Sequence, residues 1–365
     1  MNREEVNKVS EVIEVKVNEE GPDYPNYPIT PLPNYEHRQA AHCESGVTRN
    51  LLSPVSAGKI TEPLAFGIGA GLFFAHIPFM KINNGPAIAF RTMPGQIFNR
   101  TCKSLGIPVI RKKFNSKEKA EAFLKECLAD GHPVGLQVGV YYLPYFPKEY
   151  RFHFNAHNLV VYGKNADNYL VSDPIMEHTT TLDSYQLERV RFAKGALAPK
   201  GHIYYPERGA GVTDEQIKQA IKKGIRKNVY AMLNIPLPFV GVKGIKTTGN
   251  KIKKWRDKLG LKKAGSYLAQ MVRMQEEIGT GGGGFRFIYA AFLQEAHAYM
   301  QNDSLLEISQ TFTTAGDLWR TAAVQAAGIY KGRIGSQEDF NVMGDYLHEI
   351  SELEKNAFLA LRKIV

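Results

Sequence analysis

The stretch Ala41-His42-Cys43-Glu44-Ser45-Gly46 (residues 41–46) decides how the rest of the chain is interpreted. It stands where a proline-rich lead-in gives way to an expected helix that ends near residues 53–54. The first turn of a helix carries unpaired backbone N–H groups and the positive end of the helix dipole, and both favour a thiolate over a thiol. Cys43 is therefore a candidate nucleophile. The alternative is a small apolar residue in the core.

Length and composition indicate a globular protein of 365 residues, with two domains or one large domain and an appendage. The three cysteines form neither a disulfide framework nor a zinc-finger spacing, and we expect Cys102 and Cys127 on apolar helix faces in the core. The first residues contain no apolar signal core, so a cytoplasmic location is expected. Residues 63–80 carry no formal charge, but their glycines and Pro78 favour a broken, buried helix–loop segment over a transmembrane span.

The positive charge of the chain is concentrated in one segment. The net charge is +10, and residues 208–263 hold 15 Lys and Arg against three Asp and Glu. Such a segment attracts an acidic partner, which could be a nucleic acid, an anionic membrane surface or an acidic protein. Charge alone does not distinguish among these three partners. A basic helix face exposed to solvent explains the charge of this segment equally well.

The order of expected elements indicates an α+β fold with an antiparallel sheet, followed by an all-α region. Residues 1–34 are expected to be extended or disordered, residues 35–208 to form the α+β domain, and residues 209–365 a domain that is first basic and then helical. Helices are expected to start at residue 61 and to cover residues 94–105 and 116–129. Strands are expected at residues 107–110, 134–142, 156–163 and 168–174. Later helices are expected at residues 213–233, 262–278, 285–301, 303–331 and 336–363.

The last two strands read as a hairpin around a polar turn at residues 164–167. If the hairpin is symmetric about Asn165, His157 lies opposite Asp173, and directly opposed residues share a face with Cβ atoms about 4.5–5.5 Å apart. A carboxylate at that distance orients an imidazole, which can then take a proton from a thiol. A slip of one residue would separate the two side chains, and His153 is the alternative base. An edge histidine and an Asp-Pro turn without catalytic role are the competing explanation.

Two glycine-rich stretches do not match cofactor motifs. Residues 67–71 resemble part of a dinucleotide fingerprint but lack the preceding strand and the later acidic residue. Residues 279–284 lack the Lys-Ser/Thr ending of a phosphate loop and are interpreted as a flexible joint. Arg286, at the start of the next expected helix, is a candidate for holding an anion such as a phosphate. The histidines show no metal-ligand spacing, so no metal site is expected.

The order of a cysteine helix, a histidine strand and an aspartate strand resembles the papain-like fold of the C39 bacteriocin-processing peptidases. More closely, the chain resembles the family of butirosin biosynthesis protein H. The matching stretches are residues 41–46, 61–71, 142–145, 156–163, 172–174, 281–286 and 289–295. The resemblance covers roughly residues 36–330, by order of motifs rather than by continuous identity.

This resemblance implies a cysteine-dependent acyltransferase of natural-product biosynthesis. The founding member moves an aminoacyl group from the phosphopantetheine thioester of an acyl carrier protein to an amine of an aminoglycoside. By carry-over, Cys43 is the acyl acceptor, His157 the base and Asp173 its orienting acid. The implied partners are an acidic acyl carrier protein and a small-molecule acceptor, not a nucleic acid. The phosphopantetheine of the carrier is the acyl donor, and no bound cofactor is expected.

The oxyanion site departs from the peptidase pattern. C39 peptidases place a Gln six residues before the Cys, where this chain has His37. Gln39 is nearby but differently spaced, so the backbone N–H of Cys43 is expected to contribute more. Further candidates for the oxyanion or substrate site come from the matching stretches: Glu62, Tyr142 and Tyr145. Arg286 is the candidate contact for the carrier or its phosphate.

Two other functions fit the same residues. One is a hydrolase of the same fold, acting as a peptidase, amidase or thioesterase, with water in place of the acceptor. The other is a non-catalytic module whose basic segment binds an acidic partner.

Overall fold

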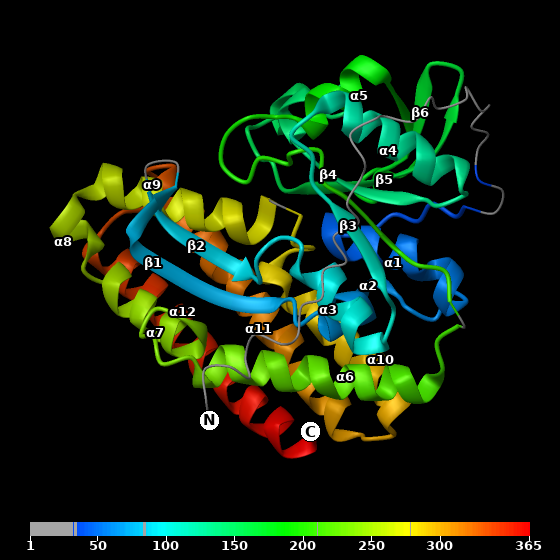
Figure 1. Ribbon diagram of the computed structural model, residues 1–365. Helices are drawn as coiled ribbons and strands as arrows, with labels where there is room; N and C mark the ends of the chain where they lie inside the picture. Colours follow the sequence, from blue (N-terminus) through cyan, green and yellow to red (C-terminus); the bar gives the residue numbers. More distant parts are fainter. Residues whose placement is uncertain (1–31, 33–34, 83–84, 210, 278) are drawn as a thin grey trace, which may run out of the picture.

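The chain forms a six-stranded antiparallel sheet flanked by helices, and a helical body that carries a separate two-stranded hairpin (Figure 1). The computed structural model describes residue 32 and residues 35–82, 85–209, 211–277 and 279–365. The expected extended segment 1–34 lies outside these residues, except for Leu32. The expectation of an α+β fold with antiparallel sheets and a helical C-terminal region is confirmed.

The six-stranded sheet is the frame that holds the candidate site. Its order is β3-β8-β4-β5-β6-β7, and every pair is antiparallel. The strands are β3 (Val109–Lys112), β4 (Val134–Val138), β5 (His157–Asn165), β6 (Asn168–Ser172), β7 (Thr180–Asp183) and β8 (Ile203–Pro206). One face packs on α4 (Lys117–Ala129) and α5 (Ser184–Arg191) through a core that includes Leu159 and Val161. Val160 and Tyr204 point instead into the second core, which contains α1 (Cys43–Ser56) and α3 (Gln96–Leu105).

The second core joins α1 and α3 to the helices of the C-terminal part. Their bounds are α6 (Asp214–Val229), α7 (Gly241–Ile252), α8 (Trp255–Leu259), α9 (Leu261–Val272), α10 (Arg286–Met300), α11 (Ser304–Tyr330) and α12 (Gln337–Ile364). π-helical turns follow α6 at Tyr230–Asn234 and α9 at Arg273–Glu277. The domain boundary near residue 208 stays a prediction, and apolar packing is continuous across it because residues on both sides share this core.

Residues 63–80 fold differently from the expected helix–loop segment. They form α2 (Glu62–Ile68) and most of β1 (Leu72–Ile82), which pairs with β2 (Gly85–Arg91). Thr61 caps α2, with Pro63 in the first turn, as expected. The hairpin packs on α7 and α9 of the helical part, so its residues are buried by segments about 170 positions later in the chain. Among the described residues, no helix has the length and apolar character needed to cross a bilayer.

Candidate active site

The candidate nucleophile, Cys43, is the first residue of α1, and the carboxylate of Glu62 holds the backbone just before it. Glu62 accepts hydrogen bonds from the backbone N–H groups of Ala41 (3.0 Å) and His42 (2.8 Å) and from the Ser45 hydroxyl (3.1 Å). His42 is the N-cap, and its Nδ1 accepts from the Ser45 N–H. These bonds fix the direction in which the chain enters α1. Cys43 is buried, with 6% of its surface still exposed to solvent. Glu62, a candidate substrate residue from the sequence, therefore positions the nucleophile.

The residues after Cys43 each tie α1 to a different neighbour. Glu44 is buried, accepts from the backbone N–H of Ile97 (2.8 Å) at the start of α3, and pairs with Arg91 (3.0 Å) at the end of β2. Gly46 lets the chain around Pro174 approach, since a Cβ there would lie 2.6 Å from the Cβ of Pro174. The motif thus serves packing as well as chemistry.

His157 and Asp173 form the predicted contact. The Nε2 atom of His157 lies 2.7 Å from Oδ2 of the fully buried Asp173. The Tyr145 hydroxyl donates to the same carboxylate oxygen (2.9 Å), and the Ile175 N–H donates to Oδ1 (3.1 Å). Tyr145, predicted from the sequence as a substrate residue, is placed where it steadies Asp173. The Nδ1 atom of His157 is left for the sulfur.

The predicted hairpin register is wrong, although the contact that it predicted exists. The turn has two residues, Ala166 and Asp167, instead of four, and a one-residue shift falls between Val161 and Gly163. Val160 consequently pairs with Ser172, and Asp173 lies just beyond the end of β6. From there its side chain still reaches back to His157. The residue inside the shift, Tyr162, stacks on the distant Tyr35 with ring centroids 4.5 Å apart, a contact that local sequence does not reveal.

Electrostatics favour a charged pair of Cys43 and His157. Burial acts to raise the pKa of Cys43, but a hydrogen bond to His157 and the positive charges of His157 and Arg91 outweigh it and hold that pKa below its ordinary value of 9.0. Burial acts to lower the pKa of His157, but the charge and hydrogen bond of Asp173, together with Cys43, raise it to about 10. Both shifts favour the thiolate–imidazolium pair over the neutral thiol and imidazole.

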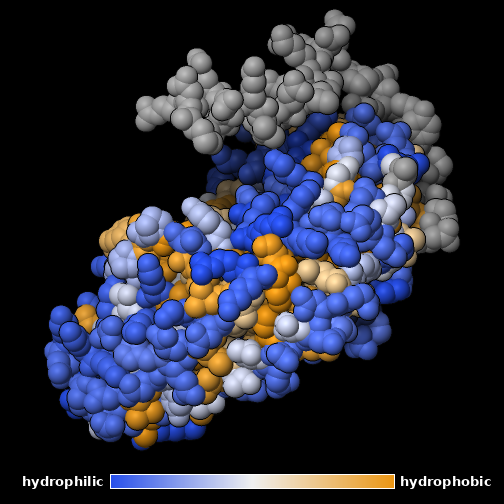
Figure 2. All heavy atoms as spheres, turned by 90° about the horizontal axis from the view of Figure 1, so that it is seen from below, coloured by the Kyte–Doolittle hydropathy of each residue, from blue (hydrophilic) through white to orange (hydrophobic). Residues whose placement is uncertain are grey.

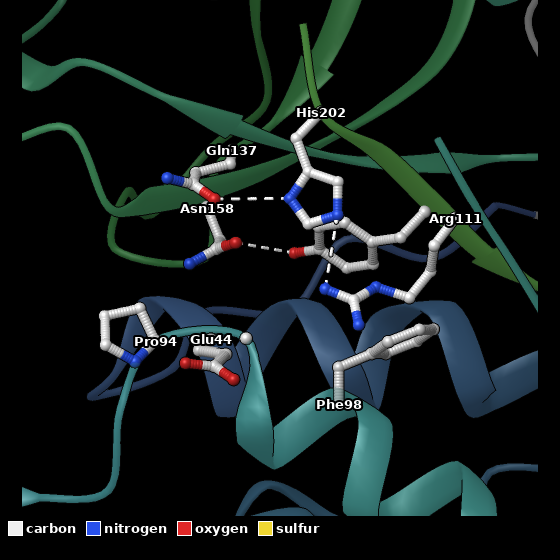
Figure 3. A pocket seen from close by; sticks show the side chains of 9 residues that line it. Glu44, Pro94, Phe98, Arg111, Gln137, Asn158 and His202 are labelled. Carbon is white, nitrogen blue, oxygen red and sulfur yellow. Dashed lines mark hydrogen bonds between the residues drawn. The ribbon is translucent and has the colours of Figure 1, made fainter. Parts of the chain in front are cut away.

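Asn158 and Tyr204 complete the surroundings of the sulfur and were not identified from the sequence. The Asn158 Nδ2 atom lies 3.9 Å from Cys43 Sγ, and its Oδ1 accepts from the Tyr204 hydroxyl at 2.7 Å (Figure 3). The alternation of β5 offers one signal: Asn158 shares a face with Val160, which packs toward α1.

A small pocket with a cavity volume of about 10 Å³ adjoins these residues. Glu44, Phe98, Arg111, Asn158, His202 and Tyr204 contribute to its lining (Figure 3). Arg111 lies 3.4 Å from His202 Nε2, and His202 Nδ1 lies 3.2 Å from Gln137 Oε1. Burial, followed by the charges of Arg111 and Lys113, lowers the pKa of His202 to about 3, so this ring is neutral. The pocket presents hydrogen-bonding groups beside Asn158, whose amide nitrogen lies 3.9 Å from Cys43 Sγ.

The candidate oxyanion residues from the sequence have other partners. The Nδ1 atom of His37 lies 2.8 Å from the Ser172 hydroxyl, and its Nε2 lies 3.1 and 3.2 Å from the carbonyl oxygens of Met176 and Glu177. The exposed Gln39 donates to the Ile175 carbonyl (3.4 Å). Both residues therefore bind the loop after Asp173, and their role at an oxyanion stays a prediction.

Tyr142 is not brought to Cys43. Its ring lies under the guanidinium of Arg189 from α5, 4.3 Å away, and packs on the core beneath α4 and α5. The alternative base His153 stacks on Tyr141, with ring centroids 4.1 Å apart.

The prediction that Arg286 contacts a carrier or a phosphate is wrong. Its side chain is fully buried and forms a two-pronged ion pair with Glu354, at 2.8 and 2.9 Å. The Trp319 indole N–H donates to the same carboxylate (2.9 Å). A guanidinium sealed in this way holds α10, α11 and α12 together and has no access to a ligand.

The glycine-rich stretches pack closely against other segments. A Cβ on Gly67 would lie 2.1 Å from the ring of Phe292, so that glycine lets α10 approach α2. Residues 279–284, interpreted as a joint, lie against the start of α1: a Cβ on Gly281 would be 3.2 Å from Ala41, and the Phe285 ring packs edge-on against His42. The helical part thus supplies a wall beside the nucleophile.

Two family models match the chain. Residues 42–174 match the family described as butirosin biosynthesis protein H, N-terminal. The resemblance to this family is confirmed. Residues 185–361 match a domain of unknown function (DUF4872), and together the two matches span both parts of the chain. No relative is found among curated proteins.

A solved structure described as a putative C39-like peptidase from Bacillus anthracis is similar to half of the chain. It is 15% identical, and the match covers 50% of this chain and 98% of that one, with a TM-score of 0.35.

Proposed function

We propose that the protein is a cysteine-dependent acyltransferase that takes an acyl group from a carrier-protein thioester and passes it to an amine or hydroxyl acceptor. The proposal rests above all on two observations: the His157–Asp173 hydrogen bond (2.7 Å), and the lowered pKa of Cys43 at the start of α1, to which His157 contributes. The match of residues 42–174 to the butirosin biosynthesis protein H family supports a biosynthetic cysteine enzyme.

The residues carry two half-reactions. The Cys43 thiolate attacks the thioester carbonyl, a carbon–sulfur bond forms, and the carbonyl electron pair moves to oxygen. Collapse expels the carrier thiol, which takes the proton of the His157 imidazolium. In the second half, His157 takes a proton from the acceptor as it attacks the acyl-Cys43 carbonyl, and the Cys43 thiolate leaves. Asp173 holds the ring and stabilises its charge throughout.

Hydrolysis by the same three residues needs only water in place of the acceptor. Cys43 is only 6% exposed, which favours a small acceptor over an extended peptide in a groove. We therefore place transfer first and thioester or amide hydrolysis second.

A basic cluster near the site supports an acidic carrier protein as the partner. Arg100 and Lys103 of α3 and Lys223 and Lys227 of α6 form this α3–α6 cluster: burial and then the charges of the other three lower the pKa of Lys227. The helix rise of about 1.5 Å per residue puts Lys103 roughly 9 Å along α3 from Ile97, which binds Glu44 beside Cys43. The lower face of the molecule, where α6 lies, is mainly hydrophilic and is crossed by an apolar band (Figure 2).

Intact-mass analysis tests the proposal. The protein is mixed with the butanoyl thioester of N-acetylcysteamine and with an acyl carrier protein that bears the same group, before and after addition of an amine. We expect a butanoyl adduct on the wild type, none on Cys43→Ala, and loss of the adduct with formation of the amide. An equal adduct on Cys43→Ala would overturn the proposal. An adduct that decays only to butanoic acid would establish the hydrolase.

A further inference from the structure

The side chain of Asn158 is aimed at the reacting sulfur. Asn158 is the second residue of β5 and is buried, and its Nδ2 lies 3.9 Å from Cys43 Sγ. It follows His157 directly, but its side chain leaves the strand on the other face. The base and the amide therefore approach the nucleophile from two directions.

The orientation of this amide is fixed by its neighbours. The carbonyl oxygen of Ala156 can only accept, so the atom 3.1 Å from it must be the NH₂ group of Asn158. The opposite atom is then Oδ1, and the Tyr204 hydroxyl at 2.7 Å donates to it. Burial, and then the nearby charges of Glu44 and Cys43, raise the pKa of Tyr204, so its hydroxyl keeps its proton. One Nδ2 hydrogen binds Ala156, and the other is left for the sulfur side.

Thioester attack creates a need for such a donor. When Sγ bonds to the carbonyl carbon, negative charge develops on an oxygen only two bonds from the sulfur. Fixed N–H groups aimed at that oxygen lower the barrier, because they need no reorganisation during the reaction. The backbone N–H of Cys43 is one such group, and no protein acceptor for it is found in the described part of the chain. A second donor is expected, but His37 and Gln39 bind the loop after Asp173 instead.

We propose that Asn158 is a catalytic residue that donates a hydrogen bond to the oxyanion, and that Tyr204 is the positioning residue that orients its amide. The inference rests on the proposed acyl transfer and names the donor for that reaction. A donor 3.9 Å from the sulfur can come within hydrogen-bond distance of an oxygen held on the attached carbon. Asn158 thus supplies from β5 what the expected Gln would have supplied from the lead-in to α1.

Two reactions of the same thiolate separate this role from a structural one. Acylation by butanoyl-N-acetylcysteamine passes through an oxyanion, whereas alkylation by iodoacetamide does not. For Asn158→Ala we expect single-turnover acylation of Cys43 to fall about 10²- to 10³-fold, the usual effect of losing one oxyanion donor. The rate of alkylation, measured at a pH at which Cys43 is a thiolate, should change far less. The reason is that the backbone N–H of Asn158 also binds Cys43, and the substitution retains it.

Tyr204→Phe and Asn155→Ala complete the test. Tyr204→Phe should lower acylation less than Asn158→Ala does, again with alkylation nearly unchanged. Asn155→Ala removes another buried amide, one that binds the carbonyl groups of Lys194 and Ala196, and should leave the ratio of the two rates as in the wild type. The inference is overturned if Asn158→Ala acylates at the wild-type rate, or if acylation and alkylation fall in parallel. A wild type that is alkylated but never acylated would instead overturn the proposed function, and this inference with it.

Discussion

Gly46 of α1 and Pro174, the residue after Asp173, are in direct contact. A Cβ built on Gly46 would lie 2.6 Å from the Cβ of Pro174 and 2.6 Å from the Cβ of Ala40, closer than carbon atoms pack. The backbone N–H of Ala40 also donates to the Pro174 carbonyl (2.7 Å). The absence of a side chain at position 46 thus sets the separation between the helix that carries the nucleophile and the chain that carries the orienting acid.

Gly46→Ala should therefore damage the site although alanine is the better helix former. The gain in helix propensity is about 1 kcal/mol, and forcing a methyl group into a closed contact costs about 1–3 kcal/mol. We expect a lower free energy of unfolding in urea and slower alkylation of Cys43. Gly265→Ala in α9 is the control, because its new Cβ would meet nothing closer than 3.4 Å, and it should be stabilising. Two variants with equal stability would contradict this account of Gly46.

Asp173→Asn should remove the charge that keeps His157 protonated. Without it, burial lowers the pKa of His157 from its value of about 10, the imidazolium is lost, and the pKa of Cys43 rises. The rate of acylation at pH 7 should fall about 10²-fold or more. Tyr145→Phe removes one hydrogen bond from Oδ2 and leaves the charge, so its effect should be smaller.

The same ion pair links stability to pH. Because the folded pKa of His157 (about 10) exceeds its ordinary value of 6.5, its contribution to folding is complete below about pH 6.5 and is lost as the pH rises towards 10. Urea denaturation of the wild type and of Asp173→Asn over this range should give curves that converge at high pH. Parallel curves would count against the pair.

Charge reversal in the α3–α6 cluster tests the carrier-protein partner. Lys223→Glu with Lys227→Glu should raise the KM for an acyl carrier protein about tenfold, since two exposed charges together contribute on the order of 1–2 kcal/mol. The KM for butanoyl-N-acetylcysteamine should not change. Lys254→Glu with Lys258→Glu makes the same charge change near α8 and serves as the control. If both pairs of substitutions raise the KM equally, general attraction explains the effect and the cluster is not the docking site.

Glu354→Gln should strongly destabilise the helical part. It leaves the guanidinium of Arg286 buried without its counter-charge, which costs about 3–5 kcal/mol. Replacing both partners by apolar residues, Arg286→Met with Glu354→Leu, should recover much of the loss. Urea unfolding measures both, and a mild effect of Glu354→Gln would show that water reaches the pair.

The parts of the fold that local sequence determines were predictable. The start of α1, the caps of α2 and α4, and the hairpin of β5 and β6 follow from helix-capping and turn residues. The register of the β5–β6 hairpin was not predictable, because it depends on a two-residue turn and on the stacking of Tyr162 on Tyr35, which lies outside the hairpin. β1 was missed because segments after residue 230 bury a run, residues 63–80, whose sequence resembles a broken helix.

The candidate site shows the same division. Cys43, His157 and Asp173 could be named because each stands at the end of an element that local pattern identifies. Asn158 could not be named from the sequence, because the orientation of its side chain depends on Tyr204 of β8, 46 residues away. Arg286 was misassigned because its buried partner Glu354 lies 68 residues later, and sequence gave no sign of it.

The reactivity of the three cysteines towards iodoacetamide as a function of pH tests the central claim most directly. Burial raises the pKa of Cys127 to about 12 and also raises the pKa of Cys102, so both serve as unreactive internal controls in the folded protein. We predict that Cys43 is alkylated rapidly at pH 6.5, that the rate depends on His157, and that peptide mass mapping finds the label on Cys43 alone. An alkylation rate at Cys43 that rises only near pH 9, as for an ordinary thiol, would contradict the account.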